Sequence, residues 1–191
     1  MTHYVYYTAT TLDGFLADDE DSLDWLLRQD VDQDGEGGYA ELIAGIGVLA
    51  MGATTYEWIL THLATTGEEW PYAQPTLVFT HRDLEPVHPS VQVVRGTPAS
   101  HRVALEEAAG ARAVWVVGGG DLAAQFAEDD MLDEVRLAYA PVTLGSGRPL
   151  FPRRWDLALE RSFTNGAFVC AVYRLVGPLR EDRVAATATS A

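Results

Sequence analysis

The sequence predicts an α/β domain with a mostly parallel central sheet, helices on both faces and an antiparallel hairpin at its C-terminal edge. Two observations support this fold class. Short β-type runs alternate with helical patterns along most of the 191 residues, and such alternation builds parallel sheets. The last two β-type runs are instead separated by Asn165-Gly166, a dipeptide that favours a tight hairpin.

Residues 3–10 are a β-rich run of aromatic and β-branched residues that is apolar on both faces, as expected of a central strand. The elements predicted after it are, in order, a short helix over 22–27, a helix over 39–44, a buried strand over 48–51 and a helix that begins after Gly52. Hydroxyl side chains can accept the free N–H groups of a helix start. We therefore expect Ser22 to cap the first of these helices, and Thr54 or Thr55 to cap the last.

The second half of the chain continues the alternation and then ends in strands alone. The predicted elements are strands over 75–80 and 91–94, a helix over 100–109, a strand over 113–117, a helix over 121–127 and strands over 134–140, 157–164 and 167–175. We expect residues 1–176 to form one domain, because this length supports a single substantial core. Residues 177–191 end in small and polar side chains, so we expect a disordered tail.

The composition excludes several classes of function. The formal net charge is −15, and all 13 basic residues are arginine. This acidity argues against nucleic-acid partners, which need a basic surface, and against anionic membranes. The sequence shows neither a signal peptide nor an apolar run long enough to span a bilayer, so we expect a cytoplasmic protein. The single cysteine, Cys170, lies in a strand-like run and is expected to be a buried thiol.

Gly118, Gly119 and Gly120 form the most informative stretch, because they join an apolar β-type run to a helical pattern. A strand, a glycine turn and a helix N-terminus together present free N–H groups and the positive end of a helix dipole, which bind phosphate. The alternative is a tight turn without a ligand, since the full dinucleotide fingerprint is missing. Two other loops, Gly52–Thr55 and Thr80–Arg82, also follow parallel strands. Ligands bind at the carboxyl ends of such strands, so convergence of the three loops favours a nucleotide site.

The order and spacing of several segments resemble the dihydrofolate-reductase-like superfamily. Within it, the chain is most similar to the reductase domain of riboflavin biosynthesis and its stand-alone bacterial relatives. The matching segments are Thr11–Ala17, Met51–Glu57, Val78–Arg82, Val116–Leu122, Asp133–Leu137 and Ala140–Phe151. The resemblance implies a three-layer dihydrofolate-reductase-like fold, NADPH as cofactor and hydride transfer to a small-molecule substrate.

The resemblance also assigns residues to the cofactor. The turn after the second strand would contact phosphate, the next loop would meet the adenosine 2′-phosphate, and the glycine turn would hold the diphosphate, with a cis peptide in its glycine pair. The residues concerned are Gly52, Thr54 and Thr55, then Thr80 and Arg82, and then Gly118, Gly119, Gly120, Asp121 and Leu122. The segment Leu144–Phe151 would frame the nicotinamide. Many relatives carry arginine where this chain has Ala53, which puts the preference for NADPH over NADH in doubt.

Asp13 and Asp24 are the candidate catalytic acids, because a reductase must supply or relay a proton to the reduced substrate. Asp13 could equally be a turn residue of its Asp-Gly pair, and Asp24 could lie on a solvated helix face. Trp70 is the best aromatic candidate for a pocket wall, because Trp70-Pro71-Tyr72 lies in a predicted loop. The histidines show no metal-ligand spacing, so no metal site is expected.

These observations lead to an NADPH-dependent reductase of a nitrogen heterocycle, with a ribosylamino-pyrimidine of the riboflavin pathway as first choice. One alternative is a dihydrofolate or pterin reductase, and another is a nucleotide-binding module without turnover. Three arginines distinguish two kinds of substrate. If they line the pocket, a phosphorylated substrate is favoured, and if they face solvent, a neutral heterocycle is favoured. They are Arg28, Arg148 and Arg153. The relatives also suggest a homodimer.

Overall fold

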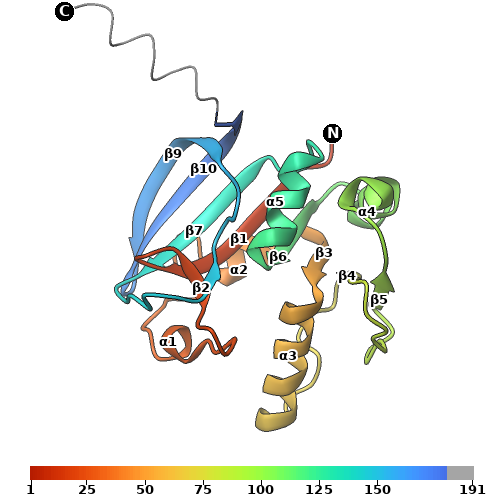
Figure 1. The fold of residues 1–191 in the computed structure, drawn as a ribbon, viewed down its shortest axis with the longest axis horizontal. Helices are drawn as coiled ribbons and strands as arrows, with labels where there is room; N and C mark the ends of the chain where they lie inside the picture. The colour runs from red at the N-terminus through yellow and green to blue at the C-terminus, as the bar shows by residue number, and fades with distance from the viewer. Residues whose placement is uncertain (180–191) are drawn as a thin grey trace, which may run out of the picture.

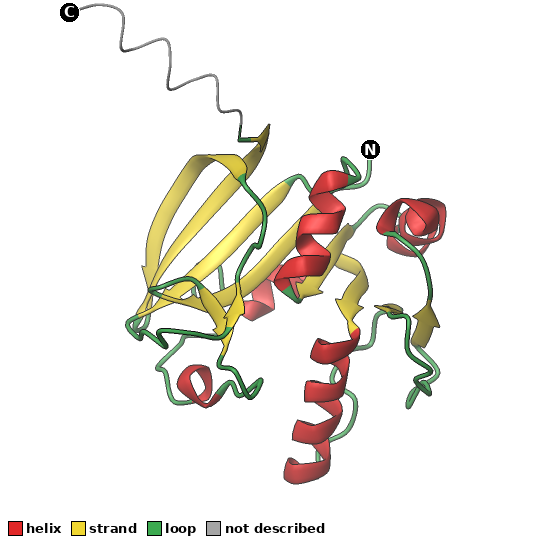
Figure 2. Ribbon diagram, in the orientation of Figure 1, coloured by secondary structure: helices red, strands yellow, loops and turns green. Residues whose placement is uncertain are grey.

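A computed structural model describes residues 1–179 of the chain. Its main sheet has eight strands in the order β5-β4-β3-β6-β1-β7-β10-β9, with helices on both faces (Figure 1, Figure 2). The strands of this sheet are β1 (Tyr4–Thr11), β3 (Ile46–Gly52), β4 (Thr76–Phe79), β5 (Val91–Val94), β6 (Ala113–Gly118), β7 (Glu134–Ala140), β9 (Trp155–Asn165) and β10 (Phe168–Pro178).

The strand directions confirm the predicted fold class. The strands from β5 to β7 in the sheet order pair in parallel, whereas β10 runs antiparallel to both β7 and β9. The hairpin therefore forms one edge of an otherwise parallel sheet. Parallel strands place their carboxyl ends at the same side of the sheet, and this arrangement positions the site described below.

Alternation along β1 divides the core into two layers. Tyr4 and Tyr6 pack on the face that carries α4 and α5, where Phe126 of α5 is fully buried. Val5 packs on the opposite face with α2 and α3, together with Ile59 of α3. Figure 1 shows α5 in front of the central strands and α2 behind them. The helices are α1 (Asp24–Leu27), α2 (Tyr39–Ala44), α3 (Ala53–Thr66), η1 (Pro98–His101), α4 (Arg102–Ala109) and α5 (Gly120–Glu128).

A second, two-stranded sheet was not predicted from the sequence. It pairs β2 (Phe15–Ala17) with β8 (Arg148–Pro149) in antiparallel fashion. The N–H group of Leu150 also donates to the carbonyl oxygen of Gly14 at 2.9 Å. This small sheet fixes the segment after β7 against the turn after β1. Among residues 1–179, no helix is long and apolar enough to cross a membrane.

The predicted caps of two helices are wrong. Helix α3 begins at Ala53 with Gly52 as its N-cap, so Thr54 and Thr55 lie inside the first turn. Gly52 has the extended backbone typical of an N-cap, and glycine is among the residues accepted there. In α1 the N-cap is Leu23, although the Ser22 hydroxyl does accept the N–H group of Asp24 at 3.1 Å.

The C-terminal hairpin forms with a register that the dipeptide alone does not predict. Asn165 pairs with Phe168, so the two loop residues are Gly166 and Ala167, and Gly166 has a φ of 55°. Strand β10 continues to Pro178, two residues into the segment that was predicted to be a tail. Leu179 follows the strand, and residues 180–191 lie outside the described residues.

Candidate active site

A cleft of about 550 Å³ opens at the carboxyl ends of the parallel strands, in the size range of small-molecule sites. All three loops that the sequence singled out contribute to its lining. The predicted cofactor residues that line it are Gly52, Thr54, Thr55, Thr80, Gly118, Gly119, Gly120, Asp121 and Leu122. Arg82 is the one predicted cofactor residue outside the lining.

The part of the cleft built from these loops, here called the cofactor arm, presents mainly backbone groups. Helix α3 begins after Gly52 and α5 begins after Gly119, and neither helix has a side-chain cap. The first N–H groups of a helix have no intrahelical partner, and here no capping side chain accepts them either. Both positive dipole ends face the cleft. The peptide bond between Gly118 and Gly119 is cis, as the resemblance implied.

The glycine turn is tightly packed on one side and open on the other. A Cβ atom at Gly120 would overlap the carbonyl oxygens of Pro149 and Leu150, whereas one at Gly119 would meet nothing within 4 Å. Gly118 has a φ of 151° and lies against the Thr55 hydroxyl, which would be 3.3 Å from a Cβ atom. Backbone can thus approach a ligand closely here, and the turn fits the diphosphate of a dinucleotide.

Charged side chains in and near the cofactor arm are already paired. The Arg82 guanidinium lies 2.7 Å from the Glu57 carboxylate, while its backbone N–H group donates to the buried Thr80 hydroxyl at 2.9 Å. The Asp121 carboxylate accepts from Gln125 at 2.8 Å and pairs with Arg153 at 3.1 Å. Asp121 therefore offers a ligand its backbone N–H group rather than a free charge.

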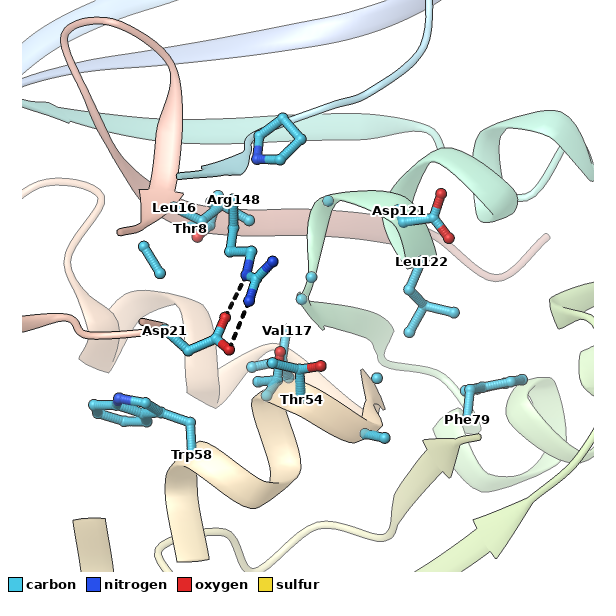
Figure 3. Close-up of a pocket in the computed structure, with 18 of the residues that line it drawn as sticks. Thr8, Leu16, Asp21, Thr54, Trp58, Phe79, Val117, Asp121, Leu122 and Arg148 are labelled. Carbon is cyan, nitrogen blue, oxygen red and sulfur yellow. Dashed lines mark hydrogen bonds and ion pairs between the residues drawn. The ribbon is translucent and has the colours of Figure 1, made fainter. Parts of the chain in front are cut away.

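The other part of the cleft, here called the acceptor end, is made mainly of apolar side chains from β1, β2, the loop before α1, α1 and α3. Its lining residues are Thr8, Ala9, Leu16, Ala17, Asp21, Leu23, Leu26 and Trp58. Figure 3 shows Leu16, Asp21 and Trp58 on the side of the cleft away from Leu122 and Phe79. Such walls favour a flat, largely apolar ligand.

Trp58, not Trp70, supplies the indole of the pocket wall. The Trp58 ring stacks on His62 with centroids 5.0 Å apart and lines the cleft. Trp70 packs instead against Tyr56 and Tyr72 in the core layer beneath α3. The prediction for Trp70 is wrong because its segment folds back onto the sheet, where the large ring is covered by other aromatic side chains.

Arg148 and Asp21 face one another across the acceptor end (Figure 3). The Arg148 Nε atom lies 2.6 Å from Oδ1 of Asp21, and an Nη atom lies 3.0 Å from Oδ2. This two-point geometry is the strong form of an arginine–carboxylate pair. It joins β8 to the loop before α1 over the cleft.

Neither predicted catalytic acid lines the cleft. The Asp13 carboxylate accepts the Thr11 hydroxyl at 2.6 Å and the backbone N–H groups of Leu144 and Gly145 at 3.0 and 2.7 Å. The hydrogen bond from Thr11, and then those from the backbone, lower the pKa of Asp13. Asp24 is exposed at the start of α1. The geometry thus gives Asp13 a role in fixing the segment after β7, and it gives Asp24 no contact with a ligand in the cleft.

Some lining residues could have been found from the sequence and others could not. Trp58 follows Thr54 by four residues, so helical spacing places the two side chains on one face. Asp21 and Arg148 are 127 residues apart. Arg148 lies in the segment that the resemblance places beside the nicotinamide, but no local pattern predicts its contact with Asp21. Arg28 and Arg153 do not line the cleft, and of the three arginines considered for a substrate phosphate only Arg148 does.

Comparison with known protein families identifies the family of this chain. Residues 3–166 match the RibD C-terminal domain. The chain belongs to this family. Among curated proteins, it is similar to the uncharacterized proteins YwjB and YyaP of Bacillus subtilis (strain 168). YwjB is 30% identical over 148 residues, covering 77% of this chain and 81% of YwjB, and YyaP is 25% identical over 171 residues, covering 83% and 87%.

Solved structures of related proteins share the fold. A candidate riboflavin biosynthesis protein from Shewanella sp. PV-4 superposes with a TM-score of 0.75 at 25% identity, covering 91% of this chain and 99% of that one. The Thermotoga maritima diaminohydroxyphosphoribosylaminopyrimidine deaminase/5-amino-6-(5-phosphoribosylamino)uracil reductase gives a TM-score of 0.65 at 16% identity. The likeness covers 92% of this chain but only 57% of that protein. This RibD-type domain therefore has a dihydrofolate-reductase-like fold, and its family is reductase-like.

Proposed function

We propose that this protein is an NADPH-dependent reductase that transfers a hydride to a nitrogen heterocycle or ribosylamino-pyrimidine. One observation carries the proposal: two uncapped helix N-termini and a glycine turn lie in one cleft with an apolar acceptor end. The first part suits the diphosphate of a dinucleotide, and the second suits a flat acceptor. Membership in the RibD C-terminal domain family supports the same activity.

The chain's own residues have distinct roles in this proposal. The N–H groups after Gly52 and Gly119 hold the diphosphate, with the loop from Thr80 to Arg82 beside the adenosine. Leu16 and Trp58 hold the acceptor against the nicotinamide and keep water out, which favours transfer between closely held partners. Bound NADPH supplies the hydride. Neither Asp13 nor Asp24 lines the cleft, so we assign the accompanying proton to neither of them.

A nucleotide-binding module without turnover is the second candidate. Among the described residues that line the cleft, the two carboxylates, Asp21 and Asp121, are both paired with arginine. Neither is therefore free to act as a general acid, and Ala53 removes a cation that many relatives carry. Both candidates require cofactor binding, but only the reductase requires consumption of the reduced cofactor in the presence of an acceptor.

A thermal-shift titration with NADPH and NADH in parallel tests the proposal first. A ligand at about 100 times its Kd stabilises the folded state by about 2.7 kcal/mol, which raises Tm by about 5–11 °C in a chain of this size. We expect this shift with NADPH and a smaller one with NADH. No shift with either cofactor would overturn the proposal. Acceptor-dependent loss of NADPH absorbance then separates the reductase from the binding module.

The proposed setting is the cytoplasm, and the proposed partners are a small-molecule substrate and a second copy of the chain. The net charge of −15 supports the exclusion of nucleic acid as a partner, because a polyanion would be repelled. Size-exclusion chromatography with light scattering tests the homodimer directly.

A further inference from the structure

The charge balance of the acceptor end bears on the kind of substrate that can enter it. Among the described residues that line this end, Asp21 is the one carboxylate, and Arg148 of the neighbouring β8 is the one guanidinium that faces it. They neutralise one another through two short contacts of 2.6 and 3.0 Å. A ligand that enters the acceptor end therefore contacts apolar side chains and an ion pair whose two charges neutralise one another.

No other described arginine is placed to receive a phosphate group here. Arg153 binds Glu128 at 2.7 Å and Asp121 at 3.1 Å, and it does not line the cleft. Arg28 is exposed at the end of α1 and also lies outside the lining. A phosphate is stabilised by charge-assisted hydrogen bonds from cations or free N–H groups, and the side chains of the acceptor end provide no free cation.

The surroundings of Arg148 oppose an anion further. The loop before α1 also carries Asp18 and Asp19, and the carbonyl oxygen of Asp19 accepts from Arg148 at 3.5 Å. The Asp21 carboxylate, followed by those of Asp19 and Asp18, raises the pKa of Arg148. One guanidinium thus faces several carboxylates, and the net local charge is negative. An incoming phosphate would have to displace Asp21 and would also be repelled by its neighbours.

We propose that the acceptor is an uncharged nitrogen heterocycle without a phosphate group, and that the Arg148–Asp21 pair excludes phosphorylated analogues. This inference rests on the proposed reductase function and narrows its substrate class. The walls formed by Leu16, Leu26 and Trp58 suit the flat faces of such a ring. Specificity of this kind comes from a feature that disfavours the wrong ligand as well as from contacts to the right one.

The test compares two acceptors that differ in one phosphate. These are 5-amino-6-(5-phosphoribosylamino)uracil and the same compound without its phosphate. Calorimetric titration of the NADP⁺-loaded protein measures binding without turnover. We expect the dephosphorylated compound to bind at least about tenfold more tightly, equivalent to 1.4 kcal/mol. Equal or tighter binding of the phosphorylated compound would overturn the inference, and so would failure of both compounds to bind.

Asp21→Asn tests the role of the ion pair. Asp21 has a φ of 62°, and asparagine tolerates this left-handed conformation as well as aspartate does. The variant keeps the shape of the loop but frees the Arg148 guanidinium. We expect the phosphorylated compound to gain at least about tenfold in affinity relative to its dephosphorylated partner. An unchanged ratio would overturn the role assigned to the pair.

Asp19→Asn is the matched control. It removes one negative charge from the same loop but leaves the Arg148–Asp21 contacts in place, and we expect the ratio to change by less than about threefold. Failure of the inference is distinguishable from failure of the proposed function. A protein that binds NADPH yet prefers the phosphorylated compound is still a reductase candidate, whereas a protein that shows no thermal shift with NADPH is not.

Discussion

The two parts of the cleft are built in different ways. The cofactor arm consists of backbone N–H groups at the starts of α3 and α5, and its shape depends on glycines that allow close approach. The acceptor end consists mainly of side chains from five separate segments, and the charges of Arg148 and Asp21 neutralise one another in an ion pair. Backbone recognition suits a cofactor that many enzymes share, whereas side chains are free to vary with the substrate.

The largest expected effect concerns the glycine turn of the cofactor arm. In Gly120→Ala, the added methyl group would overlap the carbonyl oxygens of Pro149 and Leu150. Backbone atoms cannot move aside cheaply, so we expect a loss of about 3 kcal/mol in the free energy of unfolding. That loss corresponds to a fall in Tm of about 6–12 °C for a chain of this size, measurable by differential scanning calorimetry.

Gly119→Ala is the matched control for this comparison. Its methyl group would meet nothing within 4 Å, so we expect the free energy of unfolding to fall by no more than about 1 kcal/mol. The group would, however, occupy the side of the turn that faces the cleft, and we expect weaker NADPH binding. Equal stability of the two variants would show that the turn is not packed as described.

The second largest expected effect concerns Arg82, the side chain next to the cofactor arm that could bind the 2′-phosphate of NADPH. Glu57→Gln releases the Arg82 guanidinium from its ion pair. Since exposed charge pairs contribute up to about 1 kcal/mol, we expect NADPH affinity to rise about three- to fivefold while NADH affinity stays constant. Fluorescence titration with both cofactors measures the difference, and the added change Arg82→Ala should abolish the gain.

The opposite result would restore the role that the sequence resemblance assigned to Arg82. If Arg82→Ala alone weakened NADPH binding by about tenfold or more, with NADH unaffected, the pair with Glu57 would have to open when the cofactor binds. The cofactor arm would then depend on a side chain as well as on backbone, and the contrast with the acceptor end would be smaller.

The smallest expected effect concerns Asp13, which supports the segment that carries β8 and Arg148. Asp13→Asn weakens the hydrogen bonds to Leu144 and Gly145, and we expect Tm to fall by a few degrees at about pH 7. The pKa of Asp13 is lower in the folded state than its ordinary value of 3.8. Its stabilising contribution is therefore present above that value and is lost as the pH falls below it. The difference in Tm between variant and wild type should accordingly be smaller at about pH 3 than at about pH 7. Thermal unfolding at both pH values measures it.

Enzyme kinetics separates this supporting role from catalysis. A general acid contributes about 10²–10⁴-fold to the rate, whereas a supporting residue acts mainly through stability. If Asp13→Asn lowered kcat by about 100-fold with Tm unchanged, Asp13 would be a catalytic group after all. The acceptor end would then extend to the turn after β1.

Much of the fold could be predicted because it depends on local signals. The apolar pattern of residues 3–10 predicted the central strand, and Asn165-Gly166 predicted the final hairpin. The register of the hairpin could not be predicted in the same way, because the Asn165 side chain forms hydrogen bonds with a distant loop. Its amide binds the N–H and carbonyl groups of Asp32 and the carbonyl oxygen of Glu36. A distant loop thus takes the side chain that the dipeptide pattern would place in the turn, and Gly166 and Ala167 form the turn instead.

The sequence by itself determined the α/β class, the alternation of strands and helices with its final hairpin, and the three loops of the cofactor arm. These depend on periodicity and on glycines, which are visible within a few residues of one another. Only the tertiary structure decided the acceptor end. Asp21 and Arg148 meet because β8 pairs with β2, and Asp13 is withdrawn from the cleft by the backbone of Leu144 and Gly145. Contacts between segments so far apart in the chain carry no local signal, because they form only when the sheet brings those segments together.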